Sequence, residues 1–321
     1  MPEQFQIASP PRAPAAADRA ADPTAEVPAP PRPSAPRVFL RALRPKQWAK
    51  NILVLAAPGA AGVLTEGSTP ARIALAFVAF CLVSSATYLV NDIGDVEADR
   101  RHPTKRNRPI AAGLISVRSG WIAAALLMVA GLAIAASVRL ELMGIVALYV
   151  VMTLSYTFWL KHEPILDIAV VASGFIVRAV AGGVAVDVPI SRWFLIVTSF
   201  GSLFIVAGKR HAEHLDLGPD PQTRATLAEY SAAYLRYVYS VASGVCMLGY
   251  CLWAFEQSAG ETGPWFELSI VPFVLFILRY ALLIEEGHGE APEELVLGDR
   301  TLLVFGAIWA VIYAIGVSLA H

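Results

Sequence analysis

The sequence predicts an all-α membrane protein with nine transmembrane helices. Of its 321 residues, 56% are hydrophobic and only 16% are charged. The mean hydropathy of +0.56 is typical of a polytopic membrane protein and excludes an ordinary soluble domain. Nine apolar stretches, separated by polar connections, approach the length of about 20 residues that a helix needs to cross a bilayer.

The first 36 residues differ from the rest of the chain in composition. They are rich in Pro, Ala and Arg and contain no apolar core of the kind that a secretory signal peptide requires. Because they offer little apolar surface to bury, we expect residues 1–36 to be a disordered cytoplasmic tail. Residues 37–321 are expected to form one transmembrane catalytic domain.

A basic amphipathic segment, residues 37–51, leads into the membrane. Its Trp48 and most of its cations suit the headgroup level, where they would anchor the chain. Lys46 and Lys50 are spaced i and i+4, however, and could line the mouth of a polar cavity instead.

The nine expected spans follow this segment in order. They cover residues 51–64, 73–91, 120–138, 142–160, 165–186, 193–208, 230–255, 268–284 and 301–320. The first is short and is broken by Pro58 and Gly59, so we expect it to begin before residue 51.

The Lys and Arg residues of the connections predict the orientation in the cell membrane. The N-terminal entry and the connections after the second and sixth spans are basic, whereas the connection after the seventh has no Lys or Arg. The positive-inside rule therefore places the N-terminus and these basic connections in the cytoplasm. Nine spans then place the C-terminus outside, and the chemistry is expected to face the cytoplasm, where the long polar segments lie.

The stretch NDIGDVEADRRHPTKRNRP, residues 91–109, follows the second apolar run and combines an acidic half with a basic half. On a helix, Asp92, Asp95 and Asp99 share one face, and Asn91 borders it. Three carboxylates on one face repel each other unless a cation lies between them, and Mg²⁺ takes oxygen ligands that it often shares with phosphates. A solvated helix end is the alternative, but charge at the end of a membrane helix is expensive and usually functional. We therefore expect a metal site here, with phosphate held by the basic half.

A second polar cluster follows the sixth span, in the stretch GKRHAEHLDL. Lys209 and Glu213 share a helix face at i and i+4. The cluster is either a basic cap with an internal ion pair or the second half of the site. In the latter case Lys209 and Arg210 bind phosphate, and Glu213 contacts metal or a hydroxyl group. His211 and His214 could also ligate a metal, but carboxylates are available for that.

Two other connections carry charge. Tyr156 and Lys161 close the fourth span, Asp167 enters the fifth, and Arg178 follows three helical turns later, close to the same face. Exposure of these charges to lipid is costly, so Asp167 and Arg178 either fix helix packing or line a substrate cavity. The acidic connection at 285–300 is interpreted as a solvated loop.

These motifs carry a resemblance to a known family. The pattern N-D-x-x-D-x-x-x-D at 91–99, followed by K-R-x-R-P at 105–109 and by Gly113, resembles the first aspartate-rich motif of the UbiA-type intramembrane prenyltransferases. The resemblance covers about residues 37–321. It implies nine transmembrane helices around a central cavity, Mg²⁺ as the cofactor, and a lipid tail that leaves sideways into the bilayer.

The second motif departs from that family pattern. Prenyltransferases carry D-x-x-x-D after the sixth span, whereas this sequence has KRHAE at 209–213. The stretches at 44–58, 88–113 and 201–213 closely resemble the actinobacterial phosphoribosyltransferase branch of the superfamily. This resemblance implies Mg²⁺-dependent transfer of 5-phosphoribose from 5-phosphoribosyl diphosphate to a polyprenyl (decaprenyl) phosphate, with release of pyrophosphate. The lipid product would be a precursor for cell-wall arabinan.

The resemblance also implies roles for individual residues. The catalytic residues are expected to be Asp92, Asp95 and Lys209, because Mg²⁺ under the donor diphosphate and cations at the extra C5 phosphate neutralise the charge that the reaction moves. The acceptor phosphate is already an anion, so no strong base is needed. The metal ligands are expected to be Asn91, Asp92, Asp95 and Asp99. The substrate-binding residues are expected to be Lys46, Lys50, Asn91, Lys105, Arg106, Arg108, Tyr156, Lys161, Arg178, Arg210 and Glu213.

Two other functions are compatible with parts of the pattern. One is a prenyltransferase that moves a prenyl group from a prenyl diphosphate to an aromatic acceptor. The other is an anion transporter, but transporters often have internal repeats and polar groups near the midplane, and the sequence has no clear repeat. A homo-oligomer is compatible with the apolar faces, and no nucleic-acid partner is expected.

Overall fold

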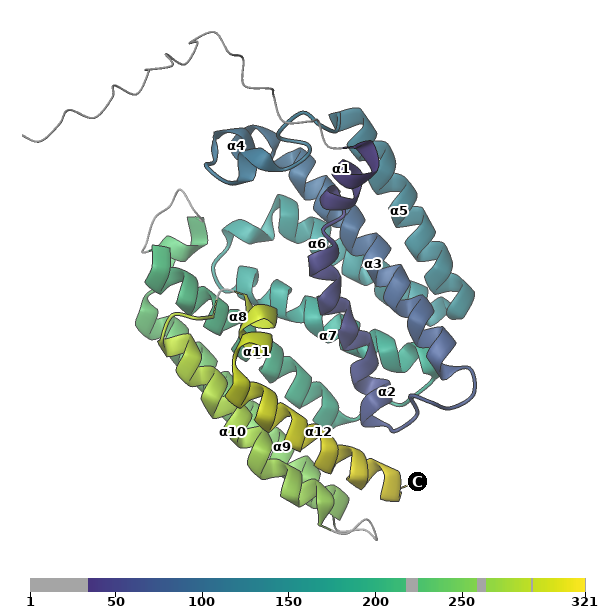
Figure 1. The fold of residues 1–321 in the computed structure, drawn as a ribbon, viewed down its shortest axis with the longest axis vertical. Helices are drawn as coiled ribbons and strands as arrows, with labels where there is room; N and C mark the ends of the chain where they lie inside the picture. Colours follow the sequence, from purple (N-terminus) through teal and green to yellow (C-terminus); the bar gives the residue numbers. More distant parts are fainter. Residues whose placement is uncertain (1–33, 218–224, 259–263, 290, 321) are drawn as a thin grey trace, which may run out of the picture. The chain divides into compact units, whose positions relative to one another are not determined.

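The structure is a computed structural model that describes residues 34–217, 225–258, 264–289 and 291–320 (Figure 1). The chain divides into two units, Met1–Ser34 and Ala35–His321. The expected tail, residues 1–36, lies almost entirely outside the described residues. Within the described part of the second unit, every regular element is a helix.

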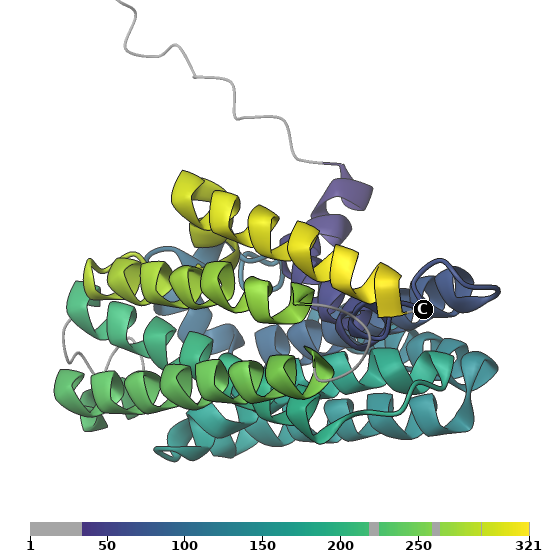
Figure 2. The same cartoon turned by 90° about the horizontal axis from the view of Figure 1, so that it is seen from below.

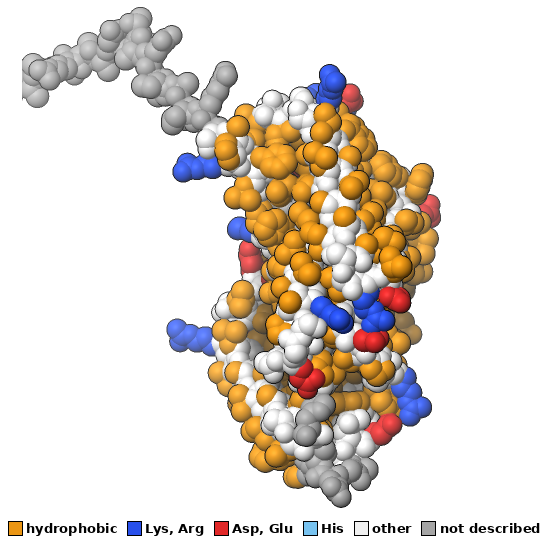
Figure 3. Space-filling model, turned by 90° about the vertical axis from the view of Figure 1, so that its right-hand side faces the viewer, with side chains coloured by type: hydrophobic (Ala, Val, Ile, Leu, Met, Phe, Trp, Pro, Cys, Tyr) orange, Lys and Arg blue, Asp and Glu red, His pale blue; other side chains and the backbone are white. Residues whose placement is uncertain are grey.

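Eight of the described helices are long and apolar enough to cross a membrane. They are α3 (Thr69–Gly94), α5 (Val117–Val138), α6 (Leu140–Phe158), α7 (Leu166–Val186), α8 (Arg192–Leu217), α9 (Ala232–Ser258), α10 (Trp265–Glu285) and α12 (Arg300–Ala320). These helices correspond to the second to ninth predicted spans. Leu126 and Val129 on α5 are both 66% exposed, and the face of the molecule in Figure 3 is mostly hydrophobic. The protein is therefore a multi-pass membrane protein.

The first predicted span is helical but is not one long α-helix. It is built from α1 (Ala35–Ala42), the 3-10 helix η1 (Pro45–Leu55) and the short helix α2 (Ala56–Ala60). Arg44 separates α1 from η1 in the left-handed region, at φ 53°, and Pro45 follows it. A bulky residue is rarely found in this region, and proline cannot continue a helix, so the segment bends here. Figure 1 shows α1, η1 and α2 running beside α3 along much of its length.

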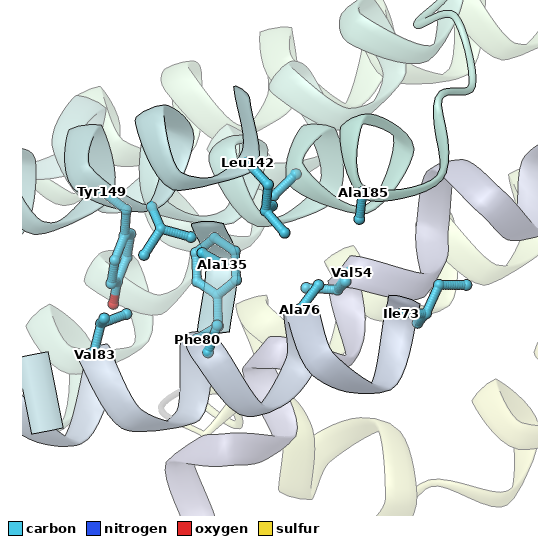
Figure 4. Packing of buried hydrophobic residues seen from close by; sticks show 12 residues of the cluster. Val54, Ile73, Ala76, Phe80, Val83, Ala135, Leu142, Tyr149 and Ala185 are labelled. Carbon is cyan, nitrogen blue, oxygen red and sulfur yellow. The ribbon is translucent and has the colours of Figure 1, made fainter. Parts of the chain in front are cut away.

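The helices pack around two main apolar clusters. In the first, α3, α5, α6 and α7 meet η1 around Phe80, Leu142 and Tyr149 (Figure 4). In the second, α8, α9, α10 and α12 meet around Phe204 and Ile277. Figure 2 shows α9, α10 and α12 stacked in that order, and α7 packs against α8 to join the two groups.

A glycine on α7 brings the N-terminal segment into the first group. A Cβ atom at Gly182 would lie only 1.7 Å from the carbonyl oxygen of Val54 on η1. Only glycine permits this approach. Because of this close approach, η1 packs directly against α7 and α3, and the basic side chains of η1 lie among the transmembrane helices.

The connection between α10 and α12 is not the solvated loop that the sequence suggested. It forms the short helix α11 (Pro292–Gly298), whose Leu295 and Val296 pack against the second apolar cluster. Burial of these two side chains outweighs the acidic character of the connection, because apolar surface removed from water stabilises a fold by roughly 25 cal/mol per Å². The remaining long connections, after α3 and α8, contain α4 (Val96–Arg101), η2 (Lys105–Asn107) and η4 (Ala225–Glu229).

Candidate active site

The acidic face predicted at residues 91–99 forms at the junction of α3 and α4. Helical hydrogen bonds continue through the junction, from the Asp95 amide to the Asn91 carbonyl and from the Asp99 amide to the Asp95 carbonyl. Asp92 and Asp99 therefore remain on one side, where both bind Arg108. Its Nη1 atom lies 3.2 Å from Asp92 Oδ1 and 2.6 Å from Asp99 Oδ2.

Asp92 is the most buried of these carboxylates, with 2% of its side chain exposed. It is also bound by Arg44, whose Nη2 atom lies 2.5 Å from Asp92 Oδ1. The Arg44 guanidinium lies over the ring of Tyr88, 4.9 Å from its centre. The strained backbone at Arg44 therefore serves to aim a cation at the acidic face, as strained residues at functional sites often do.

A pocket of about 310 Å³ opens beside Asp92. Its lining residues are Arg41, Arg44, Asp92, Thr104, Lys105, Asn107, Arg108 and Pro109. Four of these eight are cationic and one is anionic, so the pocket suits an anion. Guanidinium groups are especially suited to phosphate because they bind two oxygens at once.

Asp95 takes part in a different set of contacts. Its Oδ1 atom accepts a hydrogen bond from Lys161 Nζ at 3.0 Å, and its Oδ2 atom accepts one from the Asn91 amide at 3.1 Å. Lys161 lies on the 3-10 helix η3 (Leu160–His162), 66 residues further along the chain. The connection between α6 and α7 is thereby brought to the acidic face, as expected if Lys161 belongs to the same site.

Each of the three aspartates thus faces at least one basic side chain. Within the described ranges, no group of three or more His, Cys, Asp and Glu side chains is arranged so that it could hold a metal ion. Arg108 bridges Asp92 and Asp99, whereas Arg44 pairs with Asp92 alone and Lys161 with Asp95 alone.

The second predicted cluster, at the end of α8, contains the expected ion pair. Lys209 Nζ lies 3.7 Å from Glu213 Oε1. Arg210 is different, because its side chain is only 3% exposed and binds both Asp167 and Glu213, at 3.3 and 3.0 Å. Tyr230 also donates a hydrogen bond to Asp167, which is fully buried.

Asp167 and Arg178, considered together in the sequence, lie in separate networks. Asp167 pairs with Arg210 and fixes α7 to α8. Arg178 is 6% exposed and donates hydrogen bonds at 2.7 Å to Asn51, to Tyr149 and to the carbonyl of Gly174. All three partners are neutral, so no carboxylate contacts this buried guanidinium among the described residues.

Lys50 lies on η1 and is half-buried. Because η1 packs against α3 and α7, and α7 packs against α8, Lys50 belongs to the segment that lies beside the helices of both polar clusters.

The structure does not bring every predicted residue to the acidic face or to the cluster on α8. The side chains of Lys46 and Arg106 are exposed and form no ion pair with the described residues. Tyr156 is half-buried, within electrostatic range of Arg210. Arg41 and Arg44 were not among the predicted site residues, although Arg44 begins the stretch whose resemblance was noted.

Comparisons with known proteins agree with the fold and the motifs. A model of the UbiA prenyltransferase family matches residues 52–311. The decaprenyl-phosphate phosphoribosyltransferase of Corynebacterium glutamicum is 46% identical over 280 residues, which are 84% of this chain and 84% of that protein. The protein of the same name from Mycobacterium tuberculosis is 45% identical over 286 residues, 88% of this chain and 94% of the relative.

Among solved structures, a UbiA homologue from Archaeoglobus fulgidus bound to GPP and Mg²⁺ has a TM-score of 0.67. It is 18% identical, with 88% of this chain and 99% of that chain covered, and at this identity it bears on the fold alone.

Proposed function

The chain belongs to the UbiA prenyltransferase family, and on this premise we propose that it transfers 5-phosphoribose from 5-phosphoribosyl diphosphate to decaprenyl phosphate. The observation that carries this proposal is the identity of about 45% to phosphoribosyltransferases over nearly their whole length. The product would be a lipid-linked phosphoribose, and the second product is pyrophosphate.

The distribution of cations supports a reaction with several phosphate groups. One group of basic side chains lines the pocket beside Asp92. Arg178 on α7 and Lys209 on α8 are further cations outside that pocket. A phosphoribosyl donor carries a diphosphate and a C5 phosphate, and the acceptor phosphate is a third, separate phosphate group. A prenyl donor with a neutral aromatic acceptor would present only one diphosphate.

We assign the diphosphate to the pocket beside Asp92 and the acceptor phosphate to the surroundings of Arg178. Arg178 lies inside the candidate span α7. Its guanidinium has only neutral partners. A buried cation is costly unless an anion accompanies it, so a lipid phosphate would stabilise this residue.

The donor types of the acidic face suit Mg²⁺, because Asp92, Asp95, Asp99 and the amide oxygen of Asn91 are the oxygen ligands that this ion takes. The described residues do not gather three of the carboxylates around one point, and Arg44, Arg108 and Lys161, which bind them, are of the kind that also binds phosphate. When Mg²⁺ is bound together with the diphosphate, it neutralises the charge of the leaving pyrophosphate. Arg44, Arg108 and Lys161 can then bind phosphate oxygens.

The reaction itself needs positioning and charge neutralisation more than proton transfer. An oxygen of the acceptor phosphate attacks the anomeric carbon of the ribose, and the bond from this carbon to the diphosphate breaks. The nucleophile is already an anion, so no residue has to remove a proton from it. Arg108 and Arg44 stabilise the charge that gathers on the leaving group, and Lys209 holds the C5 phosphate.

We also propose an orientation in the membrane. The ends of α3 and α8 that carry the site, together with α4 and η2, are the basic ends, and the positive-inside rule assigns such ends to the cytoplasm. The C-terminal end of α12 would then lie on the outer side. 5-Phosphoribosyl diphosphate, a soluble and highly charged donor, would enter from the cytoplasm.

A transfer assay tests the proposed function. The purified protein in detergent is incubated with Mg²⁺, decaprenyl phosphate and ribose-labelled donor, and the lipid is extracted. We expect label in the lipid phase, and none when Mg²⁺ is chelated or the lipid is omitted. A parallel incubation contains geranyl diphosphate and an aromatic acceptor. Prenyl transfer in that incubation, with no label in the lipid of the first, would contradict the proposal.

A further inference from the structure

The hydroxyl group of Tyr230 joins two segments of the chain that the proposed reaction does not connect. It accepts a hydrogen bond from the amide of Ile165 and donates one to Asp167 Oδ1, both at 2.5 Å. Tyr230 lies between η4 and α9 and is only 4% exposed. This one buried hydroxyl therefore holds the first residues of α7 to the part of the chain that leads into α9.

The backbone of Ile165 depends on that hydrogen bond. Its φ is 67° and its ψ is −47°, a conformation that is a genuine outlier for a β-branched residue. The Ile165 side chain is 60% exposed, so burial of this side chain does not hold the conformation. The amide hydrogen bond to the buried Tyr230 holds it instead, and strained backbone persists only where its surroundings determine it in this way.

Ile165 ends the connection that brings Lys161 to the acidic face. Lys161 lies on η3, which packs against both α7 and η4, and its Nζ atom lies 3.0 Å from Asp95 Oδ1. Only residues 162–164 separate Lys161 from Ile165, and Pro164 among them has a fixed φ. The place at which Ile165 is held thus determines where Lys161 meets Asp95.

The other partner of the Tyr230 hydroxyl leads to the cluster on α8. Asp167 Oδ2 accepts a hydrogen bond from Arg210 Nε at 3.3 Å, and Arg210 Nη1 donates one to Glu213 Oε2 at 3.0 Å. The second oxygen of Glu213, Oε1, lies 3.7 Å from Lys209 Nζ. The position of Lys209 is therefore linked to the same hydroxyl.

A series of contacts consequently runs from Asp95 to Lys209 through Tyr230. The proposed function assigns Asp95 to the metal and diphosphate end of the donor and Lys209 to its C5 phosphate. We propose that Tyr230 is a positioning residue, whose hydroxyl fixes the separation between the groups that bind the two ends of the phosphoribosyl donor. The inference rests on the proposed function. A ligand that bridges both ends gains from a fixed separation, whereas a ligand that occupies one end does not.

Tyr230→Phe tests this role, because it keeps the ring in its apolar cluster with Ile168 and Leu235 and removes only the hydroxyl. The activity is measured with 5-phosphoribosyl diphosphate. Inorganic pyrophosphate with Mg²⁺, and ribose 5-phosphate, serve as inhibitors that each represent one end of the donor. We expect kcat/KM for the donor to fall about 10- to 100-fold, the cost of a misplacement of about 1 Å. Both inhibition constants and the KM for decaprenyl phosphate should change less than about twofold, since none of these ligands bridges the two ends.

Thr226→Val is the matched control. Thr226 donates another hydrogen bond to Asp167, at 3.3 Å to Oδ2, but this bond does not involve Ile165. Both variants remove one hydrogen bond from the same buried carboxylate, so both should lower the Tm in detergent. Only Tyr230→Phe should lower kcat/KM for the donor. In a Lys161→Met background the link to Asp95 is already absent, so Tyr230→Phe should lower kcat/KM by less than about a further threefold.

Several results would overturn the inference. Tyr230→Phe retains the wild-type kcat/KM for the donor, or it weakens the single-end inhibitors as much as the donor, or Thr226→Val reproduces its effect on kcat/KM. Full additivity with Lys161→Met, or a Tyr230→Phe protein that does not fold, would make the residue merely structural. A wild type that transfers no label overturns the proposed function and this inference together, whereas each of the other results, obtained beside an active wild type, overturns the role of Tyr230 alone.

Discussion

Replacement of Arg210 by methionine should destabilise the protein rather than weaken the binding of one substrate. The guanidinium is 3% exposed and its partner Asp167 is fully buried. Removal of one member of a buried ion pair costs about 3–5 kcal/mol, because the other charge stays behind. Asp167 keeps its hydrogen bonds from Tyr230 and Thr226 in this variant, so the lower end, about 3 kcal/mol, applies. For a domain of this size that is a fall in Tm of about 6 °C.

Thermal unfolding in detergent measures this effect, and Lys209→Met is the matched control. Lys209 is the next residue along α8, but its side chain is 34% exposed and its ion pair with Glu213 is 3.7 Å long. Its replacement should cost less than about 1 kcal/mol. The double variant Arg210→Met with Asp167→Leu should recover much of the lost stability, since no unpaired charge remains. Wild-type Tm in Arg210→Met, combined with a raised KM for the donor, would refute this reasoning and make Arg210 a substrate ligand.

Three further predictions concern the chemistry. Asp92→Ala and Asp95→Ala should each lose nearly all activity while the protein still inserts into membranes, and retention of activity in both would remove the argument for a metal site. Lys209→Ala should raise the apparent KM for the phosphoribosyl donor more than that for the lipid, and equal effects would argue against its assignment to the C5 phosphate. Lys50→Arg should keep most of the activity, because arginine preserves the positive charge, whereas Lys50→Ala should lose most of it, and equal losses in both variants would exclude the charge of Lys50 as the cause.

Local spacing accounts for the shared helix faces that the sequence predicted. The i and i+7 relation of Asp92 and Asp99 is a property of any helix, and it brings both to Arg108 even though the helix is interrupted near Asp95. The i and i+4 relation of Lys209 and Glu213 gives their ion pair in the same way.

Long-range pairing could not be predicted in this way. Arg44 meets Asp92 across 48 residues, and Arg210 meets Asp167 across 43. Helix periodicity shows which residues share one face of a helix, but it does not show which other helix that face packs against. The assignment of Arg210 to a substrate therefore overlooked its buried carboxylate partner.

The first span and α11 differ from prediction for opposite reasons. In the N-terminal segment, the sequence placed the break at Pro58 and Gly59, but these two residues lie inside α2, and the chain bends at Arg44 and Pro45 instead. In the acidic connection at 285–300, the short apolar run at 295–297 indicated packing against the core, but the surrounding carboxylates led to the interpretation as a solvated loop. Leu295 anchors a helix there although the segment is acidic on average.

The seating of η1 against Gly182 has a consequence for biogenesis. The segment before α3 is not among the helices that qualify for membrane insertion by length and hydropathy, so α3 is the first helix that a translocon would hold firmly. Asn51 finds its partner Arg178 only 127 residues later in synthesis. The part of η1 around Asn51 therefore reaches its final place only after α7 has been made, whereas Arg44 can already pair with Asp92 on α3. A chain that stalls before α7 lacks the helix against which Val54 and its neighbour Lys50 are seated.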